Sequence, residues 1–240
     1  MIEAINLSKL YRKQIEPVKT VKADGTSYMR RFEYVRAVDE VTLSVSQGEF
    51  VLVVGRSGSG KTTLVCMLGG LTAPTGGTIL LNGKNLWSMP DAALSRLRAE
   101  SIGFVFQFSG LLPTLTVLEN VMLPSLFVKS RNGAAKRAHA MLSAVGLNSK
   151  IHSYPSELSG GELKRAATAR ALINNPEIIL ADEPTGDLDV DSEREIIELF
   201  REINCIGKTI VMVTHNPELS VYASRVIKME KGKISPLKNQ

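Results

Sequence analysis

The sequence contains few of the residues on which several classes of protein depend. It has two cysteines among 240 residues, Cys66 and Cys205, and neither lies in a CxxC pair or beside a histidine cluster. A disulfide framework is therefore excluded and no metal site is indicated, so we expect both thiols to be small core residues in a reducing compartment. No stretch offers the roughly 20 consecutive apolar residues of a membrane span, and we expect no signal peptide.

The charge balance is also modest. The formal net charge is +5, which suits a polyanionic ligand or an anionic surface without indicating a nucleic-acid partner, and we expect none. The chain is 44% hydrophobic and 22% charged, which is typical of an ordinary globular protein. Its length suits one large α/β domain over residues 1–240.

Apolar runs and helical periodicity alternate along the chain. Nearly uninterrupted apolar runs predict strands that are buried on both faces, at residues 50–54, 177–181 and 209–213. Further strand-like runs occupy residues 2–7, 41–45, 77–82 and 102–106. Helical spacing marks residues 134–145 and 161–173, and Ile196, Ile197, Phe200 and Ile203 share one face of another helix. This alternation predicts a parallel sheet with helices on its faces.

Two segments interrupt this alternation. Residues 107–175 carry helical patterns and no sheet strand, so we interpret them as a helical subdomain between core segments 1–106 and 176–240. Residues 12–36 are strand-like around an Asp24-Gly25 turn, which predicts a β-hairpin insertion. Its charged residues are Arg12, Lys13, Lys19, Lys22, Arg30, Arg31 and Arg36 against Glu16, Asp24 and Glu33. We interpret it as a solvated surface hairpin, with a functional contact as the alternative.

Residues 55–62 match the phosphate-binding pattern G-x-x-x-x-G-K-[ST] between a strand-like run and a helix. Glycine lets backbone N–H groups wrap a phosphate, and the helix start adds donors and a positive dipole end. We expect Lys61 to contact the β- and γ-phosphates and Thr62 to ligate Mg²⁺. The alternative is a glycine-rich turn without a ligand, which the Lys-Thr pair and the helix disfavour. The predicted phosphate-binding residues are Gly55, Arg56, Ser57, Gly58, Ser59, Gly60, Lys61, Thr62 and Thr63.

A second chemical element follows the buried strand at residues 177–181. The strand ends in two adjacent acids, Asp182 and Glu183. Asp182 suits Mg²⁺ binding, directly or through water, and Glu183 is placed to polarise an attacking water as general base. Two acids at a strand end can also be a surface turn, but beside a phosphate loop they predict a P-loop NTPase that hydrolyses its nucleotide.

The class is indicated by residues 158–162, Leu-Ser-Gly-Gly-Glu, at the start of a predicted helix. Here the chain resembles the ABC ATPase family, whose signature reads Leu-Ser-Gly-Gly-Gln or a close variant, with its motifs in the same order over nearly the whole chain. The resemblance implies a RecA-like P-loop core with an antiparallel β edge and an inserted helical subdomain. It also implies that Ser159, Gly160 and Gly161 bind the γ-phosphate of ATP held by a second subunit.

The same resemblance implies roles for single residues. Gln107 matches the Q-loop and is expected to contact Mg-ATP, with Thr62 and Asp182 as the other metal ligands. Asp189 matches the D-loop, and His215 matches the switch histidine that contacts the γ-phosphate. His215, Lys61 and Glu183 are the expected catalytic residues. Tyr11 matches the aromatic residue that stacks on adenine, and Tyr34 is a competitor because segment 12–36 departs from the family's short loop.

Residues 102–107, 111–116, 119–121, 159–162 and 182–189 are similar to the macrolide-exporter and lipoprotein-release group. Two departures stand out: Leu163 and Lys164 replace the group's usual two glutamines, and Asp187 replaces its usual asparagine. The resemblance implies an ATPase subunit that powers export or extraction through an integral membrane permease. It further implies a second ATPase subunit, expected as a homodimer, and a place on the cytoplasmic side of the cell membrane, peripheral through the permease. The alternatives are a regulatory ABC ATPase without transport and a soluble, non-transport ABC ATPase.

Residues 101–128 are strongly apolar, but Pro113 and Pro124 argue against a membrane span. Much of this segment is expected to be packed core. In the family, a groove in this region receives a short helix of the permease. We therefore predict that Leu111, Leu112 and Leu115 lie near such a docking groove.

Overall fold

The computed structural model describes residues 2–22, 25–128 and 132–236, with the backbone alone for residues 16–22, 25–31 and 236. The described strands are β1 Ile2–Lys22, β2 Gly25–Val45, β3 Phe50–Val54, β4 Gly76–Leu81, β5 Lys84–Asn85, β6 Ile102–Val105, β7 Ile178–Asp182, β8 Thr209–Thr214, β9 Arg225–Glu230 and β10 Lys233–Pro236. The α-helices are α1 Lys61–Leu68, α2 Asp91–Ser101, α3 Val117–Met122, α4 Ala134–Ala144, α5 Gly160–Leu172 and α6 Val190–Cys205. Short 3₁₀ helices span Leu86–Ser88, Leu123–Phe127, Asn148–Lys150, Pro155–Glu157 and Pro217–Tyr222.

The central sheet has the strand order β10-β9-β3-β8-β7-β6. All neighbours are parallel except β10, which runs antiparallel to β9 at the edge. Every residue of β3, β7 and β8 is buried, because helices cover both faces of these strands. The predicted α/β fold with a parallel P-loop core is confirmed.

A second, antiparallel sheet has the order β2-β1-β4-β5. The sequence predicted three separate pieces here, at residues 2–7, 12–36 and 41–45, whereas β1 and β2 run through all three as one long hairpin. Register shifts at four places along β1 let the pairing continue through irregular positions. Of the predicted turn, Asp24 lies outside the described residues.

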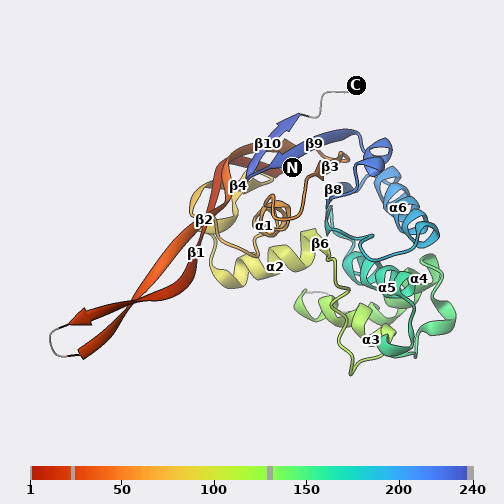
Figure 1. Ribbon diagram of the computed structural model, residues 1–240. Coiled ribbons are helices and arrows are strands. Elements are labelled where there is room, and N and C mark those ends of the chain that lie inside the picture. Colours follow the sequence, from red (N-terminus) through yellow and green to blue (C-terminus); the bar gives the residue numbers. More distant parts are fainter. Residues whose placement is uncertain (1, 23–24, 129–131, 237–240) are drawn as a thin grey trace.

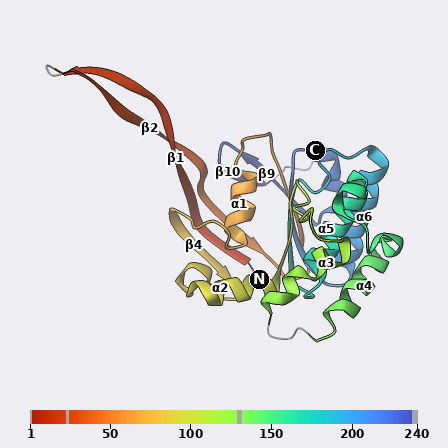
Figure 2. The same ribbon diagram turned by 90° about the horizontal axis from the view of Figure 1, so that it is seen from below.

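The hairpin extends far beyond the sheet that anchors it (Figures 1 and 2). Strand β4 pairs with β1 only as far as Ser8, and Leu10 N–H donates to the Thr75 hydroxyl just beyond it. From Tyr11 onward, β1 pairs with β2 alone, through Lys22 and Gly25. The outer part of the hairpin is thus a two-stranded ribbon that projects from the body.

Three apolar clusters hold the elements together. Helix α1 lies between the two sheets, where Leu64, Val65 and Leu68 are buried with residues of both. The opposite face of the parallel sheet is covered by α6 through its predicted apolar residues, Ile196, Ile197, Phe200 and Ile203. The third cluster joins α3, α4 and α5.

This third cluster lies within residues 107–175, where the structure places α3, α4 and α5 (Figure 1). Leu111 belongs to it and is only 9% exposed, so its side chain packs within this cluster, and its place near a docking groove stays a prediction. Its neighbour Leu112 is 47% exposed, and the buried Asn120 side chain binds both the Leu112 N–H and the Leu112 carbonyl. The division of the chain at residues 107 and 175 stays our interpretation.

The expectation that both cysteines are core residues is wrong for one of them. Cys66 in α1 is partly buried, and burial raises the pKa of its thiol. Cys205 is the last residue of α6 and is exposed, because it follows the buried face of that helix by two positions after Ile203. Among the described residues, no helix is both long and apolar enough to cross a membrane.

Candidate active site

The phosphate loop connects β3 to α1 and is shaped by close backbone approaches. Gly60 has φ +108°, and a Cβ there would lie 2.1 Å from the Ala37 carbonyl oxygen. A Cβ on Gly55 would lie 2.4 Å from the Met229 carbonyl oxygen. Larger residues are therefore excluded at both positions for steric reasons, and a ligand is not needed to explain these two glycines.

Other groups of the loop are available to an anion. Helix α1 begins at Lys61 with Gly60 as its N-cap, and no side chain of the described chain caps its first N–H groups. Among the described residues the buried Ser59 hydroxyl has no hydrogen-bond partner, although most buried hydroxyls are paired. Arg56, Ser57 and residue 58 are exposed at the top of the loop, and Thr63 is partly buried one position beyond Thr62. The loop therefore offers free donors where a phosphate group would lie.

Lys61 folds back over this loop. Its Nζ donates to the carbonyl oxygens of Gly55 at 2.7 Å and Arg56 at 3.2 Å, and it lies 3.4 Å from Glu183 Oε1. The side chain is nearly buried, so its charge acts on the loop and on the strand end opposite.

Thr62 and Asp182 meet across the sheet. The Thr62 hydroxyl donates to Asp182 Oδ1 at 3.0 Å, which joins the start of α1 to the end of β7. Burial raises the pKa of Asp182, while the hydrogen bond from Thr62 opposes that shift and the Glu183 charge adds to it. The described residues hold no cluster of three or more His, Cys, Asp or Glu side chains around one point.

This donor set suits Mg²⁺ bound with a nucleotide. Mg²⁺ is usually held by one or two protein oxygens together with substrate phosphates, rather than by a cage of protein side chains. The hydroxyl of Thr62 and the carboxylate of Asp182 supply two hard oxygens at adjacent positions. The residues present therefore fit the ion.

Glu183 follows β7 in the left-handed region, with φ +46°. Its N–H donates to the Val213 carbonyl, and its own carbonyl accepts from Gly186 N–H. Its carboxylate is bracketed by two side chains: Lys61 Nζ at 3.4 Å, and His215 Nδ1 at 2.8 Å from Oε2. The backbone N–H of His215 also donates to Oε2. A strained backbone held by such contacts is typical of functional positions.

Gln107 follows strand β6 and is exposed. Its carbonyl oxygen accepts a short hydrogen bond from Lys164 Nζ. Its side chain lies beside Gly186, where an added Cβ would be 3.5 Å from Gln107 Nε2. Gln107 is thus adjacent to the loop that follows Glu183.

The residues of the predicted signature form the start of α5. Ser159 is the N-cap: its hydroxyl accepts from Glu162 N–H, and Glu162 Oε2 accepts from Ser159 N–H at 2.8 Å. This capping box lowers the pKa of Glu162, chiefly through the Ser159 backbone N–H. Ser159 and Gly160 are exposed, so the helix start faces outward. Glu162 therefore has a structural role as the acid of the capping box, and the S-x-x-E spacing of residues 159–162 is the sequence signal for that role.

Asp189 caps the next helix. Its carboxylate accepts from the Ser192 N–H and hydroxyl, both at 2.9 Å, and these bonds lower its pKa. Ser192 also packs against Gly161, where an added Cβ would lie 3.1 Å from the Ser192 hydroxyl. The structure therefore brings Ser159–Gly161 and Asp189 into one cluster, and joins Lys61, Thr62, Asp182, Glu183 and His215 by direct contacts into another.

The two candidate adenine residues lie on the stem of the hairpin. Tyr11 pairs with Val35, whereas Tyr34 pairs with Arg12. Paired residues share a face and consecutive residues alternate, so Tyr11 and Tyr34 project from opposite faces of the ribbon. Both rings are exposed, and Lys9 Nζ lies 5.2 Å from the centre of the Tyr11 ring. Only one of them can face a given nucleotide.

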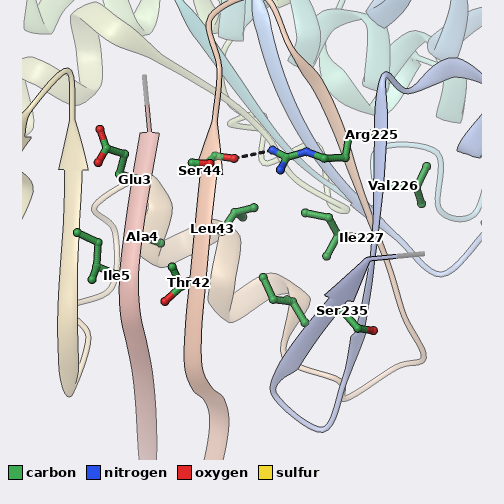
Figure 3. Close-up of a pocket in the computed structure, with 11 residues that line it drawn as sticks. Glu3, Ala4, Ile5, Thr42, Leu43, Ser44, Arg225, Val226, Ile227 and Ser235 are labelled. Atoms are coloured by element: carbon green, nitrogen blue, oxygen red, sulfur yellow. Dashed lines mark hydrogen bonds between the residues drawn. The ribbon is translucent and has the colours of Figure 1, made fainter. Parts of the chain in front are cut away.

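A cavity of about 420 Å³ lies elsewhere, between strands β1 and β2 and strands β9 and β10 (Figure 3). None of the predicted site residues lines it. Arg225 crosses it, donates to the Ser44 carbonyl and forms a 2.7 Å ion pair with Glu49. Its main cation is thus already paired, and the cavity is separate from the phosphate loop.

Comparisons with known proteins agree with this geometry. A family model described as ABC transporter matches residues 38–186. The lipoprotein-releasing system ATP-binding protein LolD of Aquifex aeolicus is 45% identical over 86% of this chain and 91% of the relative. The macrolide export ATP-binding/permease protein MacB of Rhodospirillum rubrum is 42% identical, but the match spans only 31% of its length.

A solved structure, the dimeric post-hydrolysis state of the ATP-binding cassette MJ0796 bound to ADP and Pi, has a TM-score of 0.83 at 35% identity. Each chain is covered over its full length. Because the family model spans more than half of the chain and the LolD match covers most of both proteins, the chain belongs to the ABC transporter family, as an ATP-binding and ATP-hydrolysing subunit.

Proposed function

We propose that this chain hydrolyses Mg-ATP with Glu183 as the general base, and that it powers export or extraction of a substrate through a membrane permease. The observation that supports this proposal best is that Lys61 contacts the Glu183 carboxylate on one side and His215 contacts it on the other. A carboxylate fixed at a strand end beside a phosphate loop can orient a water for attack on the γ-phosphate. Lys61 binds the phosphates of ATP. His215 holds the Glu183 carboxylate in place before the His215 ring itself contacts the γ-phosphate.

Bound Mg²⁺ neutralises charge on the β- and γ-phosphates. In this chain Thr62 and Asp182 are the proposed protein ligands, with Gln107 as the third. Thr62 presents its hydroxyl from the first turn of α1, and Asp182 presents its carboxylate from the end of β7. The donors of residues 55–63 and the Tyr11 ring complete the nucleotide site on this chain.

The second half of the site is proposed to come from a second copy of the chain. Ser159, Gly160 and Gly161 start a helix of 13 residues whose N-terminus faces solvent, which suits an anion supplied from outside. Asp189 lies beside this helix start through Ser192. The MJ0796 cassette is dimeric in two solved structures, which supports a homodimer here.

A permease contact is supported by exposed apolar side chains in the helical region. Phe108, Leu112, Leu126 and Phe127 are exposed within 20 residues that also contain α3. Large apolar side chains that are left exposed are candidates for contact with a partner protein. We propose that a cytoplasmic segment of the permease covers them, which places the chain on the cytoplasmic side of the cell membrane.

The catalytic proposal is tested by Glu183→Gln. The amide keeps the size of the side chain but cannot take a proton, so ATP turnover should fall by about 10²–10⁴-fold while ATP still binds. Glu198→Gln is the matched control, because Glu198 is an exposed carboxylate on α6 that pairs with Arg201. Hydrolysis by Glu183→Gln at near the parental rate would remove Glu183 as the base.

The permease contact is tested with Leu112→Asp, since Leu112 is exposed and its loss leaves the core intact. Val221→Asp is the control, because Val221 is 80% exposed on the 3₁₀ helix that follows β8. Leu112→Asp should reduce co-purification with the permease without changing ATP binding. Equal recovery of both variants with the permease would contradict the proposed surface.

A further inference from the structure

Helix α5, which begins at the signature, also holds the segment that contains Gln107. Lys164 Nζ donates to the carbonyl oxygens of Gln107 and, at 3.4 Å, of Phe106. Two turns further along, Arg170 donates to the carbonyl oxygens at positions 109 and 110, at 2.7 and 2.6 Å. Two cations of one helix therefore hold four carbonyls of the segment 106–110.

Lys164 is the more unusual of the two. Its side chain is 6% exposed, and no carboxylate of the described chain lies within ion-pair distance of it. Burial lowers its pKa, while the charges of Asp187 and Asp182 oppose that shift. A buried cation is costly unless it is compensated, and the contacts that the structure gives for Lys164 Nζ are the carbonyl oxygens of Phe106 and Gln107.

We propose that Lys164 is a positioning residue for ATP hydrolysis. It fixes the Gln107 backbone against the signature helix. The Gln107 side chain in turn lies beside Gly186, in the loop after Glu183, so Lys164 links the signature helix to the segment that reaches this loop. This inference rests on the proposed roles of Gln107 and Glu183.

A packing role alone does not account for these observations. An uncharged side chain of similar length would fill the same space without the cost of burying a charge. The Lys164 hydrogen bonds go to backbone oxygens 57 and 58 residues away, at the segment that enters the site.

The test compares kcat and KM for ATP in the full purified chain with saturating Mg²⁺. Lys164→Met keeps much of the side-chain length and removes the charge and the donor. We expect kcat to fall about 10–100-fold, since small misplacements at an active site have effects of that size. KM should stay within about threefold, because the Lys61 loop is untouched.

Lys208→Met is the matched control. Lys208 also donates to a backbone carbonyl, that of Asn175, and burial also lowers its pKa, but it lies between α6 and β8. Its substitution should leave kcat unchanged. Parental kcat in Lys164→Met, or an equal loss in Lys208→Met, would overturn the inference.

A second variant tests the hydrogen bonds directly, with the melting temperature of both variants measured to account for folding stability. Lys164→Gln retains an amide donor without the charge, so its kcat should lie between those of the parent and of Lys164→Met. A kcat for Lys164→Gln no higher than that of Lys164→Met would overturn the role of the hydrogen bonds. If Glu183→Gln is inactive while Lys164→Met is fully active, the proposed function stands and only this inference fails.

Discussion

The hydroxyl of Thr62 donates to Asp182 across 120 residues of sequence, at 3.0 Å. The contact joins the first turn of the helix after the phosphate loop to the last residue of a buried strand. A hydroxyl and a carboxylate at that junction form the protein side of a hard-oxygen site. The arrangement leads directly to a prediction about metal dependence.

Turnover should require Mg²⁺, because Lys61 alone cannot neutralise the charge of ATP. Asp182→Asn should lower activity by at least about tenfold at limiting Mg²⁺, and added Mg²⁺ should restore part of it. The measurement is the initial rate against free Mg²⁺ for both proteins. Asp91→Asn, at the start of α2, is a control that should behave as the parent. Full turnover in excess chelator would contradict the prediction.

Activity should also depend on protein concentration. The phosphate loop and the exposed start of α5 are proposed to act on one ATP only when they come from different copies. Specific activity should therefore rise with concentration until the dimer is saturated, which a dilution series followed by light scattering can measure. Constant specific activity in a sample shown to be monomeric would remove the composite site.

The opposite faces of Tyr11 and Tyr34 make the adenine contact separable. Tyr11→Ala should weaken ATP binding by about 5–150-fold, since stacking on an aromatic ring contributes roughly 1–3 kcal/mol per base. Tyr34→Ala should leave binding near the parental value. Binding of a fluorescent ATP analogue measures both, and the reverse result would assign the contact to Tyr34.

Acid stability should depend in part on Glu162. Its pKa is lowered in the folded chain by the Ser159 backbone N–H, so its contribution is present above the unfolded pKa of about 4.3 and is lost as the pH falls further. Glu162→Gln keeps a capping-box residue but does not titrate. Its melting temperature should therefore fall less than the parental one between pH 5 and about 3.5. Parallel curves for the two proteins would show that this carboxylate does not contribute.

The parts of the fold that the sequence predicts well are those with a local signal. The all-apolar runs of β3, β7 and β8 indicate strands buried on both faces, and the spacing from Ile196 to Ile203 marks the buried face of α6. The phosphate loop combines strand, glycines, lysine and helix within 20 residues. Such local patterns identify the element or loop from neighbouring residues alone, so contacts between distant segments are not needed to predict them.

The features that the sequence does not predict depend on contacts between distant segments. Lys164 looks like a surface residue of a helix, and its burial follows only from the Gln107 segment folding onto it. Leu111 and Leu112 are chemically alike, yet one packs into the cluster of α3, α4 and α5 and the other is exposed, which their identity alone does not indicate. Asp189 is placed by resemblance alone, and its helix-capping bonds to Ser192 become visible only in three dimensions.

The projecting ribbon of β1 and β2 bears on solubility. Beyond Leu10, neither outer edge of the ribbon is covered by β4, and open edges can pair with the same edge of another molecule. Residues 12–36 contain seven cationic and three acidic residues, so two such ribbons repel each other at low ionic strength. At physiological salt this repulsion acts over only about 8 Å. Rising ionic strength therefore weakens the protection of this edge against strand-to-strand aggregation, while the apolar core is unaffected.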